Sequence, residues 1–165
     1  MLAMLVNLRS LFKSGKVGEF IEKVQEFEEE LKNSDEGLIL IALKDTLKQD
    51  LEKARNILEK VKESSLSSAQ ALSDLGLAHF LLGDFEKAEK ILKKALKFPD
   101  VDDALYARLG ALYYAQGKLE EAEHYWERAL SLNPERAEIL YNLGVLHLNR
   151  GELEKALDYF SRALK

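Results

Sequence analysis

Small residues recur along this chain at a fixed interval of 34 residues, with no gap in the series. One alanine series and two glycine series share this interval: Ala54, Ala88, Ala122 and Ala156; Gly76, Gly110 and Gly144; Gly83, Gly117 and Gly151. Large apolar residues fill the intervals between them. A period of this length is typical of a solenoid, in which each repeat is one supersecondary unit. The pattern predicts a pair of helices in every repeat.

The spacing within a repeat predicts where these helices begin and end. With Asp103 as position 1, helix A is expected at positions 2–14 and helix B at positions 17–29. Small residues at positions 8 and 20 let the two backbones approach, so Gly110 is expected to face helix B near Ala122. Glycine at position 15, such as Gly117, is expected to take the left-handed conformation that ends helix A.

The residues of this unit carry a family resemblance. Three aromatic residues, Tyr106, Tyr113 and Trp126, alternate with small residues at fixed spacings. The full series is Tyr106, Leu109-Gly110, Tyr113, Ala122, Trp126, Ala129 and Pro134. This pattern resembles the tetratricopeptide repeat, or TPR. The resemblance implies an all-α fold, a right-handed α-solenoid of antiparallel helix pairs.

The resemblance divides the chain 1–165 into five units of one solenoid. Three units match clearly, at residues 69–102, 103–136 and 137–165. Residues 35–68 form a degenerate repeat in which Gln49 replaces the glycine at position 15. Residues 1–34 are expected to form an atypical, splayed hairpin, because Leu8 and Phe20 occupy the positions where small residues belong.

Polar residues at the ends of the predicted helices suggest caps. Ser67 with Gln70 and Asn33 with Glu36 have capping-box spacing, and Asn133 precedes a first-turn proline. The Ser-rich stretch 62–68 is either a flexible linker or an ordinary turn between repeats with a serine cap. The second interpretation is the expected one.

Composition narrows the class of function. The 165 residues include 24 Lys and Arg against 29 Asp and Glu, a net charge of −5, and 47% are hydrophobic. The chain is too apolar to be disordered, and no stretch approaches the roughly 20 apolar residues that span a bilayer. An acidic chain is a poor match for nucleic acid, whose phosphates favour a basic face. The absence of cysteine excludes disulfides and thiolate chemistry.

The N-terminal residues Met1–Val6 are apolar, as in a signal peptide. No cation precedes them and no small-residue cleavage site follows, so they are expected to form the buried stripe of a first helix. A cytoplasmic location is the resulting expectation.

Candidate chemistry is sparse. His79 and His147 both occupy position 11, two repeats apart, so they are expected to be packed core histidines that share no metal. His124 has Glu120 on the same helical face, which is either an adventitious metal site or, as expected, a solvated surface. The chain has no catalytic triad motif and no phosphate-binding glycine loop. An enzyme, a cofactor and a resident metal are therefore not expected.

The TPR resemblance implies that helix A positions 2, 5, 9, 12 and 13 line a concave groove. Here these positions are largely apolar, and exposed apolar surface usually marks an interaction site. The predicted peptide-binding residues, with Arg108 and Asn142 as polar contacts, are Leu77, Leu81, Ala107, Arg108, Ala111, Tyr114, Tyr141, Asn142, Val145 and Leu148. The alternative is that a tight superhelix or the first hairpin buries much of this surface.

Two functions follow from these features. The first is a non-catalytic module that binds an apolar peptide or an amphipathic helix of a protein partner. The second is self-association through the groove or the C-terminal repeat, because solenoids normally cover their last repeat with a polar capping helix and none follows Lys165. The other interpretations of this end are that its own substitutions solvate it, or that the sequence is part of a longer chain. The carboxylate clamp with which one TPR subgroup holds heat-shock chaperones is formed in no register, so that role is not supported.

Overall fold

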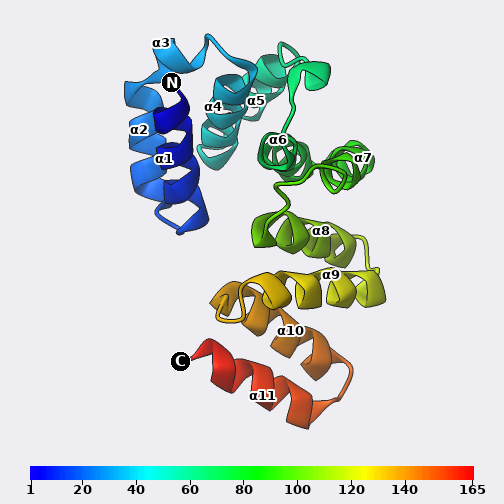
Figure 1. Cartoon of the computed structure of the whole chain (residues 1–165). Helices are drawn as coiled ribbons and strands as arrows, with labels where there is room; N and C mark the ends of the chain where they lie inside the picture. Colours follow the sequence, from blue (N-terminus) through cyan, green and yellow to red (C-terminus); the bar gives the residue numbers. More distant parts are fainter. The chain divides into compact units, whose positions relative to one another are not determined.

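The computed structural model describes all residues from 1 to 165 and contains eleven α-helices, one 3₁₀ helix and no strand (Figure 1). The backbone forms two compact units, residues 1–98 and residues 99–165. Each unit is built of helix hairpins joined by short turns. The expectation of one continuous solenoid over the whole chain stays a prediction.

In both units, consecutive helices pair as antiparallel hairpins. The first unit contains α1 (Leu2–Lys13), α2 (Val17–Glu26), α3 (Glu28–Leu31), α4 (Asp35–Leu47), α5 (Leu51–Leu58), η1 (Glu63–Ser65), α6 (Ala69–Leu81) and α7 (Phe85–Ala95). The second contains α8 (Asp103–Ala115), α9 (Leu119–Leu132), α10 (Ala137–Asn149) and α11 (Leu153–Ala163). From α6 onward, every helix begins and ends within two residues of its expected position. The helix B of repeat 2, α5, ends early at Leu58, and the second helix of the first hairpin breaks at Phe27.

The close approach of paired helices depends on glycine at position 8, which faces helix B as expected. A Cβ on Gly110 would overlap the indole of Trp126, and Gly76 and Gly144 face Leu92 and Phe160 in the same way. The side chain nearest to each glycine is therefore the large one at position 24, and at Gly76 the carbonyl oxygen of Ala88, at position 20, also lies 3.6 Å from the added Cβ. Ala122 is fully buried in the hairpin of Gly110.

The turns between helix A and helix B follow the expected left-handed conformation. The backbone φ is positive at all four position-15 glycines: Gly15, Gly83, Gly117 and Gly151. Gln49 occupies the same position in repeat 2 and has φ 67°, the only positive value at a residue other than glycine. The turn geometry is thus kept where the sequence departs from glycine.

The predicted caps are wrong by one residue. Ser34 and Ser68, not Asn33 and Ser67, cap α4 and α6 by accepting hydrogen bonds from backbone N–H groups three residues later, at 3.0 and 3.1 Å. Asp102 caps α8 in the same way at 3.1 Å. Asn133 caps no helix start and instead donates to Asp103 at 3.2 Å.

The Ser-rich stretch is an ordered turn, as expected. Its centre forms η1, where Glu63 makes an ion pair with Lys94 at 3.2 Å. Ser65 donates to Asp35, and Leu66 is 6% exposed. These contacts fasten the stretch to α4 and α7.

The first hairpin is more open than the others, as the sequence predicts. Helices α1 and α2 contact each other more sparsely than the helices of any other hairpin. Leu8 and Phe20, which replace the small residues, are both buried, and Phe20 packs edge-on against Phe12 with ring centroids 5.1 Å apart. Two large side chains thus fill the space that a glycine and an alanine leave elsewhere.

Candidate functional site

Part of the helix A face expected to line a groove is core in the first unit, although Leu2 and Leu81 are 72% and 40% exposed. At position 5, Leu5 is 3% exposed, while Ile39 and Ser73 are each 1% exposed. Leu43, at position 9, is also 1% exposed. The apolar character of these positions therefore reflects packing, which is the alternative that the sequence left open.

An ion cluster closes this face of the first unit. The Nε of Arg9 on α1 donates to Oδ2 of Asp74 on α6 at 2.6 Å, and its Nη2 lies 3.5 Å from Oε1 of Glu36 on α4. The side chains of Arg9 and Asp74 are 11% and 5% exposed. Burial favours the neutral form of Arg9, but Asp74 and then Glu36 outweigh it, so the pKa of Arg9 is raised.

The second unit exposes part of this face, although Ala104 and Ala107 are 2% and 5% exposed. Tyr114 on α8 is 38% exposed, and Tyr141 and Leu148 on α10 are 57% and 46% exposed. Of the other predicted contacts in this unit, Ala107 is buried and four are half-buried: Arg108, Ala111, Asn142 and Val145. Leu77 and Leu81 belong to the first unit, where Leu77 is half-buried and Leu81 is 40% exposed.

Both exposed tyrosines rest on an aromatic ring of their own hairpin. Tyr114 packs against Trp126 with ring centroids 5.5 Å apart, and Tyr141 packs against Phe160 at 5.7 Å. Trp126 is fixed by its Nε1, which donates to the carbonyl of Ala107 at 3.3 Å. Each tyrosine therefore presents one part of its ring to solvent while the rest is held in place by packing.

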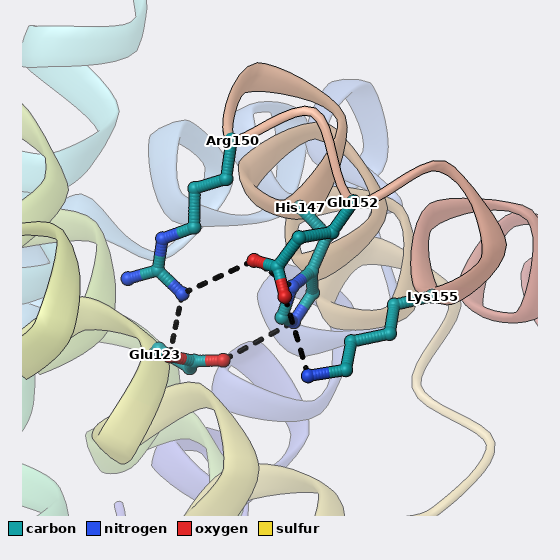
Figure 2. A network of polar contacts seen from close by, with 5 residues as sticks. All are labelled: Glu123, His147, Arg150, Glu152 and Lys155. Atoms are coloured by element: carbon teal, nitrogen blue, oxygen red, sulfur yellow. Dashed lines mark hydrogen bonds and ion pairs between the residues drawn. The ribbon is translucent and has the colours of Figure 1, made fainter.

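His147 lies in a polar network that joins three helices of the second unit (Figure 2). Its Nε2 is 3.1 Å from Oε2 of Glu123 on α9, and its Nδ1 is 3.3 Å from Oε1 of Glu152, which precedes α11. Arg150 donates to Glu123 at 2.9 Å, and Lys155 pairs with Glu152 at 3.2 Å. The hydrogen bond from His147, followed by that from Lys155, lowers the pKa of Glu152. The network fastens repeat 5 to repeat 4.

The other histidines serve packing or lie at the surface, as expected. His79 is 7% exposed, and its Nδ1 is 3.4 Å from Oδ2 of Asp84. Burial lowers the pKa of His79, although the contact with Asp84 opposes the shift. His124 is exposed and packs edge-on against Tyr125 at 5.3 Å. No group of three or more His, Asp and Glu side chains is arranged to hold a metal ion.

The sequence pattern did not predict one buried ion pair of the first unit. Lys44 on α4 is 7% exposed and its Nζ lies 2.6 Å from Oδ1 of Asp45 and 3.0 Å from Oε1 of Glu28. Burial opposes the charge on Lys44, but the hydrogen bonds to Asp45 and Glu28 outweigh it and raise the pKa. The signal was available, because repeats 3 to 5 carry apolar or aromatic residues at the same two positions, 10 and 11.

Comparison with known families agrees with this architecture. Profiles of the tetratricopeptide repeat match residues 33–99 and residues 107–165. The chain belongs to the tetratricopeptide repeat family. TPR proteins are protein-interaction scaffolds that bind protein partners, and they are generally non-catalytic.

Solved structures of TPR proteins share the fold. A thermophilic TPR protein from Thermus thermophilus is 21% identical, with a TM-score of 0.77 over 99% of this chain and 89% of its own. A crystal structure of MamA is 23% identical, with a TM-score of 0.65 over 94% and 91%. PilF of Pseudomonas aeruginosa is 18% identical, with a TM-score of 0.72 over 98% and 74%. The expected all-α solenoid class is confirmed, while no curated protein matches the sequence.

None of the helices combines the length and the apolar character that crossing a bilayer requires.

Proposed function

We propose that this TPR protein is a non-catalytic scaffold that binds an apolar peptide or an amphipathic helix through the helix A residues of its second unit. The observation that carries the proposal is a contrast at equivalent positions. At position 5, Ile39 in repeat 2 and Ala107 in repeat 4 are 1% and 5% exposed, whereas Tyr141 in repeat 5 is 57% exposed. At position 12, Thr46 is 7% exposed and Leu148 is 46% exposed. Apolar surface left open in this way favours a partner.

The side chains around these residues suit a helical ligand. Ala111 and Val145 are short and half-buried, so they leave room for a bulky ligand side chain between larger neighbours. Tyr114 and Tyr141 can pack through their rings and still form hydrogen bonds through their hydroxyls, as tyrosines in interfaces do. Arg108 and Asn142 supply polar contacts that would orient the ligand. In the first unit, Leu77 and Leu81 on α6 stay predicted contacts.

Panning of a library of amphipathic helical peptides on the immobilised full chain would test this function. The affinity of the selected peptides is then measured by fluorescence anisotropy for the wild type and for Ala111→Arg, in which a long charged side chain enters the surface. We expect Ala111→Arg and Tyr141→Ala to weaken binding at least about tenfold, as truncation of an aromatic anchor does. Circular dichroism checks that both variants stay helical.

The matched control is Leu153→Arg, which places the same side chain on an exposed position of α11. This variant should bind the peptides like the wild type. Equal affinity of all variants would place the binding surface elsewhere. Loss of helix content in Ala111→Arg would show that Ala111 belongs to the core.

Self-association is the second candidate function, and the outer face of α11 favours it. Leu153, Leu157 and Leu164 are 59%, 68% and 88% exposed on one face of this helix. Leu157 stands at position 21, where repeats 2 to 4 carry charged residues: Arg55, Glu89 and Glu123. An apolar side chain at this open position suits a second copy of the chain.

Sedimentation equilibrium distinguishes this function from peptide binding. We expect a concentration-dependent dimer for the wild type and a monomer for Leu157→Lys, with peptide affinity unchanged. A wild-type chain that stays monomeric at all concentrations would contradict self-association and leave the peptide-binding proposal intact.

A further inference from the structure

Repeat 2 carries charges at two positions where repeats 3 to 5 are apolar or aromatic. Its positions 10 and 11 are Lys44 and Asp45, which are 7% and 2% exposed. The equivalent residues elsewhere are Ala78 and His79, Leu112 and Tyr113, and Leu146 and His147. A buried ion pair is often no more stabilising than the apolar residues that could replace it. Stability alone therefore does not explain why repeat 2 has a buried ion pair at these positions.

The buried pair forms part of the wall of a cavity in the first unit. The cavity has a volume of about 420 Å³ and lies between α3, α4 and α5. Its charged lining consists of four lysines and two acids, Lys32, Lys44, Lys53, Lys60, Glu28 and Asp45, so the local charge is 4 − 2 = +2. The chain as a whole has a net charge of −5. The cavity is thus a basic site in an acidic protein.

The positive charges at the cavity are not cancelled by neighbours. Lys53 and Lys60 are exposed, make no ion pair, and lie seven residues apart with Asn56 between them, on the side of the α5 segment that lines the cavity. Lys32 lies after α3, and its pair with Glu29 at 3.3 Å is largely in solvent, where such pairs are weak. Lys44 is the buried member, and its two carboxylate partners hold its ammonium in place.

We propose that this cavity binds a small, multiply charged phosphate anion. An excess of two positive charges matches a phosphate monoester dianion or pyrophosphate, and lysine binds phosphate as a compact point charge. The volume lies in the range of pockets for small molecules. Leu38 and Ile57, which also line the cavity, offer apolar contacts for the organic part of a phosphate ester.

Isothermal titration calorimetry of the full chain tests the site with three probes: inorganic pyrophosphate, phenyl phosphate and citrate. The variant Lys53→Gln/Lys60→Gln removes two exposed ammonium groups at the cavity. Its matched control, Lys48→Gln/Lys97→Gln, removes two exposed lysines that do not line the cavity and changes the net charge equally. We expect saturable binding of both phosphates to the wild type and the control, and at least about tenfold weaker binding to the cavity variant.

Three results would overturn the proposal. They are the absence of saturable pyrophosphate binding to the wild type, an equal loss of affinity in both double variants, and citrate binding as tight as that of pyrophosphate. Because the substituted lysines are exposed, unchanged thermal melting should verify folding of both variants. The peptide affinities of the second unit should not change, so this site and the proposed scaffold function are tested separately.

Discussion

The indole of Trp126 covers Gly110 so closely that a Cβ on this glycine would overlap its Cδ1 and Nε1 atoms. Trp126 is 2% exposed, and its Nε1 donates to the carbonyl of Ala107 at 3.3 Å. The spacing between α8 and α9 therefore depends on one large ring on α9 and the absence of a side chain on α8.

Gly110→Ala should destabilise the protein by about 1–3 kcal/mol, because the added methyl group overpacks the contact with Trp126. Urea denaturation measures the change. In Gly18→Ala, on α2, the new Cβ would meet no atom within 4 Å. This control lies at the second residue of α2, so it should keep at least the wild-type stability. A gain in both variants would contradict the packing described for Gly110.

Gln49→Gly should stabilise repeat 2. Gln49 has φ 67°, a conformation that costs an ordinary residue about 1–2 kcal/mol and costs glycine nothing. We expect the free energy of unfolding to rise by about 1 kcal/mol, less the extra flexibility that glycine gives the unfolded chain. Lys48→Gly, at φ −87°, carries only that second cost and should be destabilised. The opposite order of the two variants would show that the turn is not strained.

His79 should make folding stability depend on pH. Burial lowers its pKa in the folded protein, whereas the unfolded chain titrates at about 6.5. Below about pH 6.5 the unfolded chain therefore binds a proton that the folded chain does not, and the free energy of unfolding falls as the pH falls.

Chemical denaturation at about pH 7.5 and pH 5.5 should reveal this loss in the wild type and a smaller loss in His79→Tyr. Tyrosine stands at the equivalent position in repeat 4, as Tyr113, so the variant is expected to pack. His124→Gln, at an exposed position, should keep the wild-type dependence. An unchanged dependence in His79→Tyr would assign the effect to another group.

Glu123 should be the main polar link between repeats 4 and 5. It contacts Nε2 of the buried His147 at 3.1 Å and Nη1 of Arg150 at 2.9 Å. Glu123→Ala leaves a buried ring nitrogen without a partner, which typically costs about 1–3 kcal/mol. Hydrogen exchange should therefore speed up in α10 and α11, while Glu121→Ala, at an exposed position of the same helix, should change little. Similar exchange in both variants would show that packing alone joins the repeats.

The local part of this structure could be predicted from the sequence, because each repeat folds by contacts that recur every 34 residues. The period could also have placed the caps correctly, since Ser34, Ser68 and Asp102 all have capping side chains at this interval, whereas the series of Asn33 and Ser67 continues with Val101. The exposure of the helix A face could not be predicted. In the first unit this face is closed where Arg9 reaches Asp74, a contact between residues 65 apart that no repeat pattern encodes.

The contact between Arg9 and Asp74 also has a consequence for the order of folding. Contacts within the hairpins close short loops, whereas this one spans 65 residues and requires α1, α4 and α6 to be in place. Contacts between distant residues pay a larger loop-closure entropy, so we expect this one to form after the rate-limiting barrier. In stopped-flow experiments, Arg9→Met should accelerate unfolding and leave the refolding rate nearly unchanged. The ion cluster would then lower the unfolding rate of the first unit without raising its folding rate.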